Sequence, residues 1–208
     1  LLKYDYYNFA KLNNNILKNY IHNDIDVVVF CNNDIILKTP CIDEIAKLIR
    51  NNIDRVGTVG CRLLFDNDTI QHDGQLIVVD KDNLAFKMAT HRALRAPVEK
   101  IKKRILSESI AGNTFALCGT PLKLLKIFGY LNESYNFCFE DVEYNLKCLL
   151  DRRTNILLPD NIWAYHLESA TRKSVENDHI KFTQDIHTLI SFYNENFKNK
   201  KHPEFLTI

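Results

Sequence analysis

The apolar positions of the chain follow two spacings, one typical of helices and one typical of buried strands. Residues 8–20 carry apolar side chains at helical spacing, and residues 26–31 form an unbroken apolar run rich in valine. Such a run is typical of a strand buried on both faces of a parallel sheet. A helix over 40–51, capped by Thr39, and a second buried strand at 55–61 follow. This order predicts an α/β fold with a mostly parallel, mixed sheet flanked by helices.

The rest of the chain predicts shorter elements. Residues 63–79 show three short apolar runs separated by Asp, Asn and Gly, a pattern that predicts a small antiparallel insertion. The later elements are a strand at 108–118 interrupted at Gly112, a short helix from Thr120-Pro121, an amphipathic helix at 140–150, strands at 154–158 and 162–166, and a last helix at 176–196. We therefore expect one domain over residues 1–208, with a basic insertion at 80–107 and a helical extension at 174–208.

The basic insertion has the weakest periodicity of the chain. Between Lys87 and Arg104 there are seven Lys or Arg residues and one acid, Glu99. This charge pattern is typical of a solvated loop and helix. It is also typical of a flap that faces a phosphate-bearing ligand or an anionic lipid surface. The sequence leaves both interpretations open, so peripheral membrane contact is one of its predictions.

Bulk composition narrows the class of protein only slightly. The formal net charge of +1 does not indicate a nucleic-acid partner, and the longest apolar runs are far shorter than the roughly 18 residues of a membrane span. The six cysteines form no CxxC pair, and most lie in apolar stretches. We expect free, buried thiols in a reducing compartment, and hence a cytoplasmic protein.

The first candidate for chemistry is the turn Asn32-Asn33-Asp34, directly after the strand at 26–31. Open α/β sheets bind ligands at the carboxyl ends of their parallel strands. Magnesium is typically held by one or two carboxylates together with substrate phosphates. Asp34 fits that role, although an aspartate at a turn or helix cap is equally common.

The second candidate is Glu140-Asp141, which opens the helix at 140–150 after an aromatic run. Acidic residues favour the first turn of a helix because they interact with its dipole. The alternative is a catalytic base held at a helix N-terminus beside aromatic walls. Both interpretations fit the sequence.

The third candidate is His166, which follows a short strand and precedes the cations Arg172 and Lys173. A histidine at this place can be a metal ligand, a proton carrier or a structural side chain. The two cations can meet a diphosphate or can simply be solvated.

The order of these segments resembles family 2 glycosyltransferases of the GT-A fold, in particular those that build bacterial polysaccharides. The matching segments are NND at 32–34, VGTVGCRLLFDNDTIQHDGQ at 56–75, AGN at 111–113, FEDVEYNLKCLL at 139–150, and YHLESATR at 165–172. The family's corresponding segments have the forms LNNDT, VGxVGxRLxxxDGxIQHxG, TGA, FFEDVDLCLRL and YHxxSxSR. The likeness extends from about Asn8 to Arg172.

The resemblance implies a metal-dependent inverting transfer of sugar from a UDP- or dTDP-sugar to a glycan or lipid-linked acceptor, at the inner face of the cytoplasmic membrane, with Mn²⁺ or Mg²⁺ as cofactor. The implied roles are Asp141 as general base with Glu140 as its partner, Asp34 and His166 as metal ligands, Asn32, Asn33 and Arg172 in donor binding, and Gly112 and Asn113 in acceptor binding. His72 and Gly74 fall in a matching segment without a defined role.

The chain departs from the family's pattern in several respects, among them Phe128-Gly129-Tyr130 in place of the usual glycine pair and Glu143 where Asp is more usual. The family's first strand and nucleotide-binding loop have no counterpart before Asn8, so we expect an N-terminally incomplete domain. The acidic motif retains one carboxylate, Asp34, and Leu167 stands where a second histidine is frequent. The alternative function is therefore a non-catalytic module that binds a nucleotide-sugar or a glycan within a larger protein.

Overall fold

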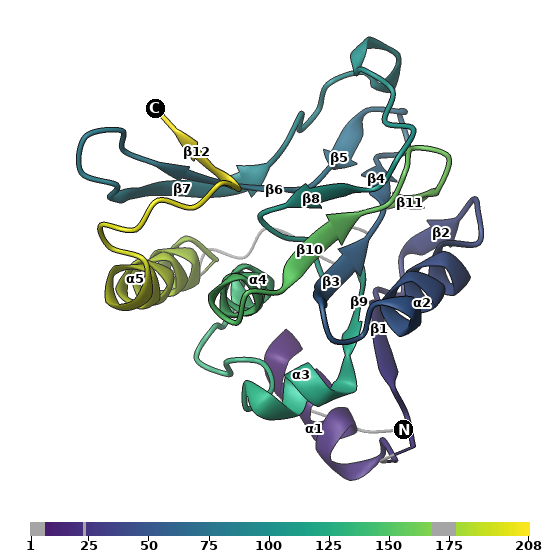
Figure 1. Ribbon diagram of the computed structural model, residues 1–208, viewed down its shortest axis with the longest axis horizontal. Coiled ribbons are helices and arrows are strands. Elements are labelled where there is room, and N and C mark those ends of the chain that lie inside the picture. Colours follow the sequence, from purple (N-terminus) through teal and green to yellow (C-terminus); the bar gives the residue numbers. More distant parts are fainter. Residues whose placement is uncertain (1–6, 23, 168–177) are drawn as a thin grey trace.

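The computed structural model of the chain (Figure 1) describes residues 7–22, 24–167 and 178–208. Its largest sheet has five strands in the order β1 (Val27–Cys31), β9 (Leu117–Pro121), β3 (Val56–Gly60), β10 (Thr154–Leu157) and β8 (Glu108–Ile110). A four-stranded sheet has the order β2 (Ile35–Leu37), β11 (Trp163–His166), β4 (Arg62–Leu64) and β5 (Ile70–His72). A three-stranded sheet contains β12 (Phe205–Thr207), β6 (Gln75–Val79) and β7 (Phe86–His91).

The helices cover these sheets and form the core with them. They are α1 (Phe9–Asn19), α2 (Cys41–Asn51), α3 (Leu122–Ile127), α4 (Glu140–Leu150), α5 (Asp178–Asn196) and the short 3-10 helix η1 (Val98–Lys100). Helix α2 packs on β1, β9 and β3, whereas α4 packs on β3 and β10. Gly119 allows the close approach of α2, because an added Cβ would lie 2.8 Å from Ile49 Cδ1. The α/β class is therefore confirmed, with mixed sheets and flanking helices.

The prediction of a mostly parallel sheet is wrong. Strands β3 and β10, β4 and β11, and β6 and β12 run parallel, and the other six described pairings are antiparallel. The apolar runs at β1 and β3 correctly indicated strands. However, β9 inserts between them in the opposite direction, and a long-range pairing of this kind leaves no mark on the local pattern.

The position of β1 also differs from the prediction. Within the described residues β1 is an edge strand, and Val27, Val28 and Val29 are half-buried, whereas β3 is buried throughout. Thr39 does not cap α2. Its hydroxyl instead donates to the carbonyl oxygen of Trp163 and accepts from the Trp163 N–H, which ties the start of α2 to β11. An apolar run thus identifies a strand but not how many neighbours it has.

The two segments predicted to be irregular or helical contain strands. Residues 80–107 include β7, which pairs with β6 along its whole length. Residues 178–208 contain α5 and then β12, which pairs with β6 in parallel. None of the helices in the described ranges is long and apolar enough to cross a membrane.

Candidate functional site

The turn after β1 and the end of β11 bring Asp34 and His166 together. Strand β2 follows the turn and pairs with β11, so that Ile35 lies opposite His166, and the Leu167 N–H donates to the Asp34 carbonyl oxygen. His166 Nε2 lies 3.1 Å from Asp34 Oδ1 and 3.4 Å from Asn32 Nδ2. Asn33, between Asn32 and Asp34 in the sequence, is exposed. Three of the predicted metal and donor residues therefore form one cluster.

Gln71 on β5 fixes the orientation of the His166 ring. Its amide oxygen lies 2.6 Å from His166 Nδ1, and its amide nitrogen donates to the His166 carbonyl oxygen at 3.5 Å. With Nδ1–H donating to Gln71, Nε2 is the nitrogen that faces Asp34 and Asn32. Histidine ligands of metals are commonly held in this way, with the other ring nitrogen donating to a fixed acceptor. The sequence analysis did not find Gln71.

The Asp34 and His166 pair fits a divalent cation. A ring lone pair and a carboxylate oxygen 3.1 Å apart repel each other unless a proton or a cation lies between them. Two ligands at about 2.1 Å from one octahedral ion are about 3 Å apart. Asp34 Oδ1 is buried and has no hydrogen-bond partner among the described residues. No group of three or more His, Cys, Asp or Glu gathers within those residues, so this cluster supplies two such ligands.

Asp141 lies at the start of α4 and shares an anchor with this cluster. Its Oδ2 accepts from the Phe115 N–H at 3.2 Å, and the Asn32 N–H donates to the carbonyl oxygen of Ala116 at 2.8 Å. Phe115 and Ala116 are consecutive residues, with Cα atoms about 3.8 Å apart. The predicted base and the predicted metal-binding turn are therefore attached to neighbouring residues of one segment.

The surroundings of Asp141 favour its protonated form. Burial raises the pKa of the Asp141 carboxyl, while the opposing effects of His91 and of the Phe115 N–H lower it. A carboxyl with a raised pKa beside a ligand-binding segment is typical of a catalytic acid or base. This observation favours the catalytic interpretation of Asp141 over a stabilising role at the helix N-terminus.

His72 and His91 form a hydrogen-bonded pair, and His91 lies close enough to Asp141 to influence its pKa. Their Nδ1 atoms lie 2.7 Å apart, so one donates and the other accepts. Burial, then the neighbouring charge of His91, lowers the pKa of His72 well below its usual range, which keeps this ring neutral. The sequence analysis missed His91 because it ends β7, in the insertion that showed no periodicity.

The predicted acceptor residues Gly112 and Asn113 are buried in a polar network. Asn113 has no exposed surface, and its amide donates to Thr58 Oγ1 and to the Ile156 carbonyl oxygen. Asn145 accepts from the Asn113 N–H and donates to the carbonyl oxygens of Asn113 and Asp141. An added Cβ on Gly112 would lie 2.6 Å from Asn145 Cβ. Both residues thus position the 111–116 segment, and the side chain of Asn113 is buried rather than presented to a ligand.

The start of α4 is held by α5. Phe139 precedes Glu140 with φ 77°, a left-handed conformation that is strained for an aromatic residue, and its ring packs on Phe182. Asp185 is fully buried and accepts from the N–H groups of Asn136, Phe137 and Cys138. Glu140 itself is half-buried in the first turn of the helix. Helix α5 therefore fixes the loop that leads into Glu140-Asp141.

Asp185 should be required for this loop to stay ordered. We expect Asp185→Ala to lower the free energy of unfolding by about 3 kcal/mol, because buried N–H groups lose their acceptor. Hydrogen exchange of residues 136–139 should accelerate. Gln184→Ala, on the exposed side of the same helix turn, is the control. Unchanged exchange in Asp185→Ala would show that the loop holds its conformation without α5.

The basic insertion is anchored by ion pairs, of which those of Arg104 are buried. Arg104 pairs with Asp73 at 3.0 Å and with Asp160 at 2.6 Å, and Arg92 forms two hydrogen bonds with Glu108. Lys87 pairs with Asp80 at 2.9 Å. These three cations are paired with acids within the protein, which leaves Arg95 and the exposed lysines of the insertion as the described cations that can meet an external ligand. The predicted donor residue Arg172 lies outside the described residues.

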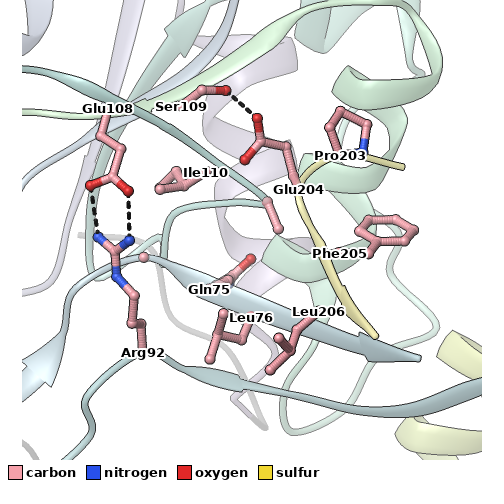
Figure 2. A pocket seen from close by; sticks show the side chains of 12 residues that line it. Gln75, Leu76, Arg92, Glu108, Ser109, Ile110, Pro203, Glu204, Phe205 and Leu206 are labelled. Atoms are coloured by element: carbon pink, nitrogen blue, oxygen red, sulfur yellow. Dashed lines mark hydrogen bonds and ion pairs between the residues drawn. The ribbon is translucent and has the colours of Figure 1, made fainter. Parts of the chain in front are cut away.

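A pocket of about 220 Å³ lies between β8, β6 and β12 (Figure 2). Its polar groups are largely paired with each other, since Glu108 binds Arg92 and the Ser109 hydroxyl donates to Glu204 at 2.6 Å. None of the predicted site residues lines it. The pocket is therefore separate from the Asp34 and His166 cluster and from Asp141.

Comparison of the chain with models of known protein families gives no match, and comparison with curated proteins gives no significant relative.

Proposed function

We propose that the chain is a metal-dependent inverting glycosyltransferase of the GT-A type, similar to family 2. It transfers a sugar from a UDP- or dTDP-sugar to a hydroxyl of a bacterial surface glycan or lipid-linked acceptor. The observation that carries this proposal is the convergence of Asp34 and His166, 132 positions apart in the sequence, at 3.1 Å. Asp141, with its raised pKa, is attached to the same segment of chain.

The composition of the cluster suits a donor that carries a diphosphate. One carboxylate and one imidazole are few ligands for a divalent cation, and magnesium commonly completes its shell with water and substrate phosphates. Bound between Asp34, His166 and the diphosphate, Mn²⁺ or Mg²⁺ would neutralise the negative charge that develops on the leaving group. Gln71 holds the ring of His166, and the Leu167 N–H, next to His166, donates to the backbone carbonyl oxygen of Asp34.

A residue of the chain, Asp141, takes the proton of the acceptor hydroxyl. The acceptor oxygen forms a bond to the anomeric carbon while the bond from that carbon to the diphosphate breaks, so the centre is inverted in one displacement. Asp141 takes the hydroxyl proton through the carboxylate oxygen that does not bind Phe115. Its raised pKa increases its strength as a base. His91, close enough to influence that pKa, stabilises the ionised carboxylate before the reaction.

The same pair of side chains also allows a second function. Asp34 and His166 can also form an ion pair with a proton between them, which would close the cluster without a metal. The chain would then be a non-catalytic module that binds a nucleotide-sugar or a glycan. The two functions differ in whether binding of a diphosphate requires a divalent cation.

Calorimetric titration separates them. We expect UDP, dTDP and inorganic pyrophosphate to bind in the presence of Mn²⁺ or Mg²⁺ and to lose binding in EDTA. Pyrophosphate is included because it tests the diphosphate contact without the base and ribose. Metal-independent binding of a nucleotide-sugar or glycan, with no response to pyrophosphate and metal, would support the binding module and contradict the transferase.

A further inference from the structure

The segment between η1 and β8 exposes apolar and cationic side chains together, at the upper right of Figure 1. Ile105 and Leu106 are each 77% exposed, more than any other large hydrophobic residue that the structure describes. Lys100, Lys102 and Lys103 lie two to five positions before Ile105 and are exposed as well. Exposing two adjacent aliphatic side chains to water is unfavourable unless a partner covers them.

The exposure is built into the fold through Arg104, which lies between Lys103 and Ile105. Its guanidinium is buried against Asp73 and Asp160 and donates to the Leu158 carbonyl oxygen. Its backbone N–H donates to Asp160 Oδ2, and its carbonyl oxygen accepts from the Asp160 N–H. With this residue fixed inward, its neighbours on both sides are held outward.

The chemistry of the segment matches an anionic lipid surface. The segment carries three exposed lysines and one exposed acid, Glu99. Arg104 and Glu108 add little to its charge, because Arg104 is paired with Asp73 and Asp160, and Glu108 is paired with Arg92. Lysines near an anionic bilayer are attracted to its headgroups, while adjacent aliphatic side chains enter the interface. The cores of protein–protein interfaces are instead depleted in lysine and enriched in aromatic residues. The composition therefore favours lipid over a protein partner.

We propose that residues 100–106 form a membrane-docking segment, in which Ile105 and Leu106 insert into the interface of an anionic bilayer and Lys100, Lys102 and Lys103 bind its headgroups. This binding is independent of the proposed transfer reaction and can be measured without a donor or an acceptor. Through this segment, the basic insertion holds the protein at a membrane surface.

Vesicle sedimentation tests the docking segment. The protein should bind vesicles of phosphatidylcholine mixed with phosphatidylglycerol, bind phosphatidylcholine alone weakly, and be released by high salt. Ile105→Ser with Leu106→Ser, and separately Lys102→Glu with Lys103→Glu, should each lower the partition coefficient by about tenfold or more. The control is Ile127→Ser, since Ile127 is 58% exposed on α3, which lies near the bottom of Figure 1, well below β8.

A direct probe checks insertion of the segment. Leu106→Trp should give a blue shift of its fluorescence and quenching by brominated lipids on anionic vesicles, over the constant background of the single native tryptophan, Trp163. All variants should unfold at the wild-type temperature because the substituted side chains are exposed. The proposal is overturned if the wild type ignores anionic vesicles, if both double variants bind as the wild type does, or if Ile127→Ser abolishes binding.

Discussion

Asp141→Asn is expected to abolish sugar transfer, by about a thousandfold or more in kcat, while the fold stays intact. Asparagine keeps the shape of the side chain and the oxygen that accepts from the Phe115 N–H, but it cannot take a proton. Nucleoside diphosphate released from UDP- and dTDP-sugars in the presence of acceptor gives the rate. The control is Asp151→Asn, at the far end of α4, where the carboxylate pairs with Arg153 on the surface.

The same variant separates the catalytic role of Asp141 from a stabilising role at the helix N-terminus. Burial raises the pKa of Asp141, so folding favours its neutral form and disfavours the carboxylate. Above that pKa the ionised group costs stability, and Asp141→Asn should leave the melting temperature at pH 7 unchanged or raise it. A residue that served only the helix dipole would instead lose stability on neutralisation. A lowered melting temperature with normal turnover would contradict the assignment as base.

The pH dependence of transfer follows from the same shift. A base must be ionised to accept a proton, so activity should fall as the pH drops through the pKa of Asp141. Because burial raises this pKa, the acidic limb of the profile should lie above the value of about 4 that is usual for a carboxyl in water. His91→Gln removes a charge that lowers the pKa, and it should therefore move the limb to higher pH.

The elements that the sequence predicted best are those that their own residues define. The helix predicted at 140–150 agrees with α4, whose Val142, Leu146 and Leu149 face the core at helical spacing. The strand at 55–61 agrees with β3, which is buried throughout. Strand direction was missed because the antiparallel insertion of β9 between β1 and β3 depends on residues about sixty to ninety positions away.

In the candidate site, too, the residues with a local sequence signal were predicted and those that depend on long-range contacts were not. Asp34, His166 and Asp141 stand out in the sequence as polar residues at the ends of apolar elements. The structure brings Asp34 and His166 together, and Asp141 accepts from the Phe115 N–H, next to the residue that anchors the Asn32 turn. Asn113 also stands out, but the sequence does not show that its amide is used by Thr58. His91 lies in a segment without periodicity and gives no local signal.

Asp185 is a different case, because the sequence does contain its signal. It lies at helical spacing with Leu189 and Tyr193, so an acid occupies the apolar face of α5. A charge at such a position needs buried partners, which here are the backbone N–H groups of the loop before α4. An acid on an apolar helix face is therefore a useful indicator of a buried anchoring role.

Asp34→Ala and His166→Gln are expected to remove metal-dependent binding of UDP and of pyrophosphate, with affinity falling by about a hundredfold or more. Each substitution removes one of the two ligands that the described residues supply, and a single remaining ligand cannot position a cation against a diphosphate. Gln71→Ala leaves both ligands in place and releases only the ring of His166. Its effect should be intermediate, about ten- to a hundredfold.

The graded response of these variants distinguishes a metal site from a simple ion pair. If Asp34 and His166 shared only a proton, their substitution would change the stability of the protein. The affinity for pyrophosphate would then respond only weakly to Mn²⁺, in the variants as in the wild type. Asp68→Ala serves as the control, because this exposed acid binds the Tyr165 hydroxyl one residue before His166. Only a cation held between the two side chains makes diphosphate affinity depend strongly on Asp34 and His166, less on Gln71 and not on Asp68.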